Sequence, residues 1–183
     1  MEFKKQTGHF FSSVTLLKIL IFSALIFVSA TLQSSFFSAT GFFPATPDLL
    51  LATVIGLGVY DGEKSGAVAG VGAGVLAEAF GAGGDIMLLP VFYMLVGFSF
   101  GIVARIFLNK NLLSWLVYML IASTLRGMLS LVHTVLSEAD INLFLIFRDI
   151  IFPEFALTVL FALPIFFLVR LCARPFHKKI EMD

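Results

Sequence analysis

Two charged side chains lie inside apolar stretches of the sequence, where a charge is costly and usually serves a purpose. Glu78 ends a glycine-rich segment, and Arg126 lies in the middle of a long apolar run. Each follows the start of its segment, Lys64 or Leu112, by 14 residues, which corresponds to about 21 Å of helix. Because they would lie at matching depth in a bilayer, we predict that Glu78 and Arg126 form an ion pair.

Few other side chains are suited to chemistry. His133 lies two helical turns beyond Arg126, and Glu154 begins the last apolar segment on the same predicted side. With Glu78 they could in principle bind a metal, but their spacing matches no metal motif. An intramembrane enzyme would have to use Glu78, Arg126 and His133. Cys172 is the single cysteine, which excludes a cysteine-rich metal site. We therefore predict no enzyme activity, no metal and no cofactor.

Small residues are concentrated in the centre of the chain, where ten of the fifteen glycines lie between Gly56 and Gly84. Residues four apart share one face of a helix, and small side chains there let membrane helices approach closely. The pattern predicts either internal helix packing or a face for a partner's helix. This helix-packing or partner face comprises Gly66, Gly70, Gly74, Glu78 and Gly81.

The composition identifies the medium in which these helices lie. Hydrophobic residues make up 59% of the 183 residues and charged residues only 13%, whereas soluble domains carry about 25% charged residues. The net charge of zero argues against nucleic acid as a partner. We therefore predict an integral membrane protein in contact with the lipid bilayer.

The lengths of the apolar runs predict an all-α, polytopic transmembrane bundle of about six helices in a single domain, residues 1–183. A bilayer-spanning helix needs about 20 mostly apolar residues. The predicted spans are 14–37, 48–60, 64–80, 86–108, 112–136 and 150–172. The second and third are short, so a re-entrant pair is an alternative to two full crossings. The first resembles a signal peptide, with Val28-Ser29-Ala30 as a candidate cleavage site, but its length favours an uncleaved span.

Basic residues predict the orientation of the bundle. With both termini in the cytoplasm, the inside segments hold most of the lysines and arginines, and the outside loops hold only Arg148. This asymmetry is the positive-inside pattern. An odd number of spans would place the basic tail, Arg174 to Lys179, outside.

Three stretches of the sequence together resemble MreD, the rod shape-determining membrane protein family of bacteria. They are Thr46-Pro47-Asp48-Leu49-Leu50-Leu51, the series Gly66-x3-Gly70-x3-Gly74-x3-Glu78-x2-Gly81, and the run from Leu163 to Arg170. The resemblance covers nearly the whole chain in length, span number and motif order. One departure is Glu78, where the family usually has aspartate.

The resemblance implies a non-enzymatic subunit of the cell-elongation machinery in the bacterial cytoplasmic (inner) membrane. It implies MreC, the actin-like MreB, the glycosyltransferase RodA and a class B penicillin-binding protein as partners, and a role in cell shape and lateral peptidoglycan synthesis. It also implies a fold similar to the six-helix substrate-binding subunits of vitamin transporters.

The alternative function is such a transporter subunit, which binds a small molecule and works with an energy-coupling module. Those subunits typically carry an Ala-x3-Ala pattern in the first span. Here Ala24 is followed at that spacing by Val28, and Ala30 by Ser34, so the pattern is missing.

Overall fold

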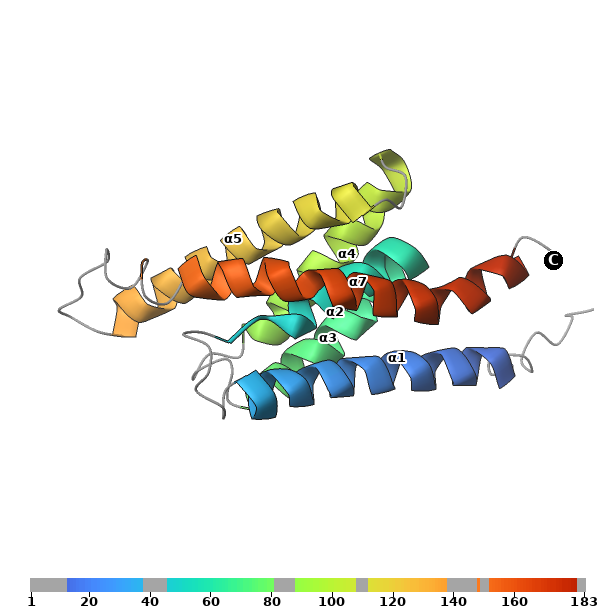
Figure 1. The fold of residues 1–183 in the computed structure, drawn as a ribbon, viewed down its shortest axis with the longest axis horizontal. Coiled ribbons are helices and arrows are strands. Elements are labelled where there is room, and N and C mark those ends of the chain that lie inside the picture. The colour runs from blue at the N-terminus through green and yellow to red at the C-terminus, as the bar shows by residue number, and fades with distance from the viewer. Residues whose placement is uncertain are drawn as a thin grey trace, which may run out of the picture.

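The chain is an all-α bundle. The computed structural model describes residues 13–37, 46–80, 88–107, 112–137, 148 and 152–180. In this part α1 (Ser13–Thr31) continues into a π-helical turn, η1 (Leu32–Phe37). Five further α-helices follow: α2 (Leu49–Asp61), α3 (Glu63–Ala79), α4 (Leu89–Phe107), α5 (Leu112–Ser137) and α7 (Phe152–Ile180). Figure 1 shows α1, α5 and α7 as long helices, with α2, α3 and α4 packed between and behind them.

Four of these helices are long and apolar enough to cross a membrane, so the chain is a multi-pass membrane protein. The candidate spans are Leu16–Ser35, Leu89–Ile106, Leu112–Val132 and Phe152–Ala173. The described helices begin and end within a few residues of the segments predicted from the sequence, except that α7 continues to Ile180. The helical backbone therefore extends beyond the apolar run that ends at Cys172.

The short helix α2 is the centre of the bundle. It packs against α1, α3, α4, α5 and α7, and every residue from Leu49 to Tyr60 is buried. Its 13 residues span only about 20 Å, compared with a bilayer core of about 30 Å. Because other helices surround α2, its short length exposes no backbone to lipid.

A tight turn joins α2 to α3. Gly62 has a φ of 98° and forms the only connection between the two helices, and this left-handed region favours glycine. Its N–H donates to the carbonyl of Gly58 at 3.0 Å, and its own carbonyl accepts from the N–H of Gly66 at 3.0 Å. The turn closes the end of one helix and opens the next, so α2 and α3 form an antiparallel hairpin.

Ion pairs lie at the end of the bundle that holds this turn. Lys18 of α1 pairs with Asp61 at the end of α2. Arg105 near the end of α4 pairs with Glu63 at 2.9 Å. The backbone N–H of Glu63 itself and the Arg105 guanidinium lower the pKa of the Glu63 carboxyl. This charged end is the one that the positive-inside pattern predicts to face the cytoplasm.

Large apolar side chains also cover the outside of the bundle. Many on α1, α3, α4, α5 and α7 are more than 40% exposed, including Leu20, Val68, Leu95, Leu113 and Leu171. A soluble protein rarely shows such a continuous apolar surface. In a bilayer these side chains meet lipid tails, which is consistent with the four candidate spans.

Candidate functional site

Side chains from three segments cap the N-terminus of α2. The Asp48 carboxylate accepts from the N–H of Leu51 at 2.9 Å, and the Gln33 side-chain oxygen accepts from the N–H of Leu50 at 3.2 Å. The N–H of Asp48 itself donates to the Thr158 hydroxyl at 2.9 Å. The first N–H groups of a helix have no partner within it, and in a membrane an unmet N–H costs several kcal/mol. A helix that begins inside the bundle therefore requires this cap.

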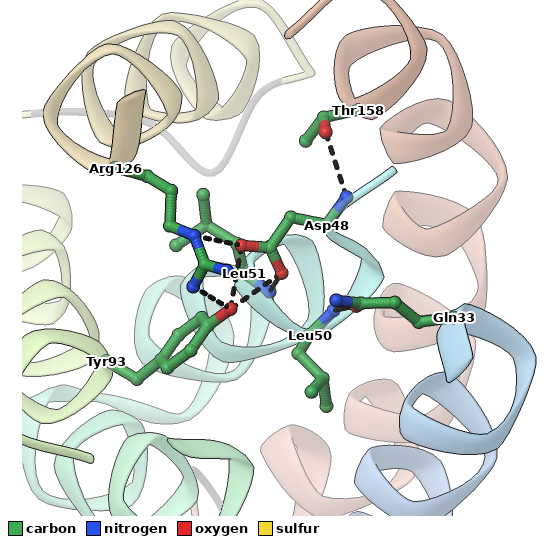
Figure 2. A network of polar contacts seen from close by, with 7 residues as sticks. All are labelled: Gln33, Asp48, Leu50, Leu51, Tyr93, Arg126 and Thr158. Atoms are coloured by element: carbon green, nitrogen blue, oxygen red, sulfur yellow. Dashed lines mark hydrogen bonds and ion pairs between the residues drawn. The ribbon is translucent and has the colours of Figure 1, made fainter. Parts of the chain in front are cut away.

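Asp48 is also the centre of a buried polar cluster, which we call the Asp48 lock: Asp48, Tyr93 and Arg126 (Figure 2). The Tyr93 hydroxyl donates to the two Asp48 carboxylate oxygens, at 2.8 and 2.7 Å. Nη1 of Arg126 donates to the Tyr93 oxygen at 2.8 Å, and Nε of Arg126 lies 3.5 Å from Oδ2 of Asp48. The guanidinium also lies 5.5 Å from the centre of the Tyr93 ring. Each member therefore contacts both others.

The lock is enclosed by the bundle. Asp48 and Tyr93 are 2% and 0% exposed, and the Arg126 side chain is 13% exposed. Attraction between opposite charges is much stronger in such surroundings than in water, and so is the penalty for a charge left alone. The contacts join the start of α2 to the middle of α5 and the first half of α4, through residues that are 45 and 33 positions apart in sequence.

The π-helical turn η1 places Gln33 at the start of α2. Turns of this kind are rare and often lie at functional positions. Gln33 is 7% exposed and turns toward Leu50 (Figure 2). One turn earlier on the same helix, the Ser29 hydroxyl lies 2.8 Å from that of Thr53. Polar contacts therefore hold the end of the first helix against α2.

The glycine face of α3 packs against the backbone of α4. A β-carbon at any of the three glycines would overlap main-chain atoms of that helix. Gly66 lies against Gly97, Gly70 against Tyr93 and Gly74 against Pro90. The neighbouring alanines Ala69, Ala73 and Ala77 are buried too. Between the two interpretations of this pattern, the structure selects internal packing, and the contact at Gly70 fixes the backbone of Tyr93.

The prediction of an ion pair between Glu78 and Arg126 is wrong, because the acidic partner of Arg126 is Asp48. Among the described residues, Arg126 forms its ion pair with Asp48. Glu78 lies near the end of α3, and its carboxylate accepts from the N–H of Leu89 at 3.3 Å. Glu78 therefore caps the start of α4, which is a structural role for an acidic side chain at a helix N-terminus.

The other predicted residues are distributed as follows. Gly81 lies outside the described residues. His133 belongs to α5, and its side chain lies outside the described part. Glu154 lies in the first turn of α7, next to Asp48 and Arg126 of the lock. In the described ranges no group of three His, Cys, Asp or Glu side chains is arranged to hold a metal ion.

Sequence reasoning missed Asp48, Tyr93, Gln33 and Thr158 as members of the site. Asp48 had a usable signal, because an aspartate just before an apolar helix is a typical N-cap. At the start of a helix too short to span the bilayer, such a cap must lie below the membrane surface. Tyr93 had no such signal, since tyrosine near a span end is ordinarily an interfacial residue.

A small cavity of about 10 Å³ lies beside the lock, with Asp48, Ser123, Arg126, Glu154 and Thr158 as its polar lining. This volume suits about one water molecule. The lock itself contains a carboxylate, a phenol and a guanidinium that bind one another. Such an arrangement holds the helices that carry these side chains in place.

No family model matches the chain, and neither a curated protein nor a solved structure matches it. The resemblance to MreD therefore rests on the motifs of the sequence.

Proposed function

We propose that this protein is a non-enzymatic membrane subunit of the bacterial cell-elongation complex, as the resemblance to the MreD family implies. In this proposal it lies in the cytoplasmic membrane with both termini in the cytoplasm. It contributes to cell shape by holding other components of lateral peptidoglycan synthesis. MreC, MreB, RodA and a class B penicillin-binding protein are the expected partners.

Residues from two of the three stretches that carry the resemblance help to build the interior of the bundle. Asp48 of the Thr46–Leu51 motif is the centre of the lock. The glycines of the second motif set the contact between α3 and α4. A motif that maintains a rigid interior leaves the outer surface free to vary with the partner. This is what a scaffold subunit requires, since its task is to present fixed surfaces.

The observation that carries the proposal is that the two charges of the Asp48 lock, on Asp48 and Arg126, are engaged with one another. Asp48, Tyr93 and Arg126 are linked by contacts of 2.7–3.5 Å, and the cavity beside them measures about 10 Å³. Pockets for small organic ligands measure about 300–1,000 Å³. The polar centre of the described bundle is therefore far too small for a vitamin, which favours the scaffold over the transporter subunit.

The apolar outer surface supports helix–helix contacts with other membrane proteins. Beyond Lys64, the exposed residues of α3 are small or β-branched, namely Val68, Val71, Gly72, Val75 and Ala79. Short side chains let a second helix approach closely in lipid, where packing rather than the hydrophobic effect drives association.

The decisive experiment is depletion of the protein in the bacterium that encodes it, with cell shape and lateral peptidoglycan incorporation as readouts. We expect rods to round up and lateral incorporation to fall, and wild-type protein supplied from a plasmid to restore both. Normal rods with a growth defect that one vitamin relieves would contradict the proposal and favour the transporter subunit.

Complementation by variants then connects shape to the lock. Tyr93→Phe removes a hydroxyl that joins two charges. Tyr118→Phe removes a buried hydroxyl that has no hydrogen-bond partner in the described part of the chain. We expect the first variant to restore rod shape poorly and the second to restore it fully.

A further inference from the structure

The cavity beside the Asp48 lock contains polar groups that the lock does not use. The Ser123 side chain is 8% exposed, and its hydroxyl, which lines the cavity, has no hydrogen-bond partner in the described part of the chain. Glu154 lines the same cavity from α7. It is half-buried, and no described residue forms a hydrogen bond or ion pair with its carboxyl group.

The charges around this cavity do not balance if Glu154 is ionised. Asp48 and Arg126 form an ion pair and cancel. Tyr93 is neutral, because its hydroxyl donates to Asp48. An ionised Glu154 would therefore add a net negative charge to the interior of a membrane protein, where an uncompensated charge is costly.

One unit of positive charge restores the balance, and the size of the cavity limits its form. The volume of about 10 Å³ admits about one water molecule. A protonated carboxyl has an O–H donor and a carbonyl acceptor, whereas a serine hydroxyl can both donate and accept. The guanidinium of Arg126 has five N–H donors in total, and the lock accounts for Nε and one hydrogen on Nη1.

We propose that this cavity is a proton-binding site, in which Glu154 carries a proton and one water molecule joins it to the Ser123 hydroxyl. Loss of that proton would place a second carboxylate near Arg126, in competition with Asp48 and Tyr93. Arg126 is the residue through which the lock holds α5 to α2 and α4. The attachment of α5 is therefore strongest when Glu154 is protonated and weakens as the pH rises and the proton leaves.

The test is labelling with dicyclohexylcarbodiimide, a membrane-soluble reagent that reacts with protonated carboxyl groups. The full-length protein, reconstituted in lipid nanodiscs, is treated across a range from mildly acidic to mildly alkaline pH. The modified residue is mapped by mass spectrometry. We expect an adduct on Glu154 that decreases as the pH rises, with little on Asp48, and no adduct at this position in Glu154→Gln.

Two outcomes would overturn the proposal. A folded protein in which Glu154 stays unmodified at every pH would show that the carboxyl is ionised throughout. Protection of Glu154 by sodium ions at constant pH would show that the site binds a metal cation instead of a proton.

A second measurement does not depend on the reagent. We expect the thermal unfolding midpoint of the wild type to decrease at high pH. Glu154→Gln keeps the shape of the side chain and cannot ionise, so its midpoint should not show this decrease. Ser123→Ala should shift the pH at which labelling is half-complete, because it removes a partner of the protonated form. Ser99→Ala, at an exposed position on α4, is the matched control and should shift nothing. Equal pH dependence in wild type and Glu154→Gln would refute the proposal.

Discussion

The Arg126 guanidinium lies 3.5 Å from the Asp48 carboxylate, and the Tyr93 hydroxyl connects the two groups. Three helices therefore meet at one charge pair in the interior of a membrane bundle. The relationship explains why α2 can begin below the membrane surface. It also generates predictions about stability that do not depend on the function of the protein.

Asp48→Asn should be strongly destabilising, because it leaves Arg126 as a buried charge without its partner. Breaking a buried pair costs about 3–5 kcal/mol. Thermal unfolding in detergent or nanodiscs measures the loss. Arg126→Leu should be similarly damaging alone, and the double variant should lose less than the sum of the two. Strict additivity would show that Asp48 and Arg126 are not coupled.

Combining Glu78→Gln with Arg126→Leu provides the control for the Asp48–Arg126 double-mutant comparison. Glu78 caps α4 and shares no described partner with Arg126, so their effects should add to within about 0.5 kcal/mol. The same unfolding assay applies. Strong coupling between Glu78 and Arg126 would instead support the ion pair that the sequence predicts.

Tyr93→Phe should cost about 1–3 kcal/mol, because Arg126 and Asp48 each lose a buried hydrogen-bond partner. Tyr118→Phe should be neutral or slightly stabilising, since the buried Tyr118 hydroxyl has no hydrogen-bond partner among the described residues. Comparing the thermal unfolding midpoints of the two variants separates the stability that the Tyr93 hydrogen bonds contribute from the effect of removing a hydroxyl group. Equal losses of stability in the two variants would argue that the Tyr93 hydroxyl does not stabilise the Asp48 lock.

Gly70→Ala should destabilise the bundle, because the new methyl group overlaps the backbone of Tyr93 and Met94. Overpacking costs about 1–3 kcal/mol. Gly72→Ala, two residues along the same helix, places its methyl group where no atom lies within 4 Å. Alanine is the better helix former by about 1 kcal/mol, so this control should be neutral or stabilising. The two variants are compared by unfolding and by accumulation in membranes.

Cysteine labelling in whole cells tests the orientation. In a Cys172→Ser background, cysteines at Ser38, Gly83 and Asp140 should react with an impermeant thiol reagent, because the basic asymmetry places these positions outside. A cysteine at Lys179 should react only after the cells are opened. Labelling of Lys179 in intact cells would contradict a cytoplasmic C-terminus.

The sequence predicted the helices well, since apolar length is a direct requirement of the bilayer. The four-residue repeat of Gly66, Gly70 and Gly74 likewise predicted a closely packed face, because spacing determines which residues share a side of a helix. The repeat did not predict which helix covers that face, and the structure shows that α4 does.

The partner of Arg126 could not be predicted in the same way. Counting residues along a helix gives depth in the membrane but not direction around the helix axis. Glu78 was therefore chosen for its depth, whereas Asp48 is the residue that faces Arg126. Asp48 was interpreted as the start of a span, and its second role depends on how α2, α4 and α5 pack.

The cap on α2 has a consequence for biosynthesis. Thr158, which accepts from the N–H of Asp48, belongs to α7, whereas Gln33 precedes α2. During translation the second helix therefore emerges with part of its cap in place and receives the rest only after α7 is made. Until then, the N–H of Asp48 lacks this partner, and an unmet N–H is costly inside a membrane. A chain truncated before α7 should consequently accumulate less than the longer chain, because the cap on α2 is complete only when α7 is present.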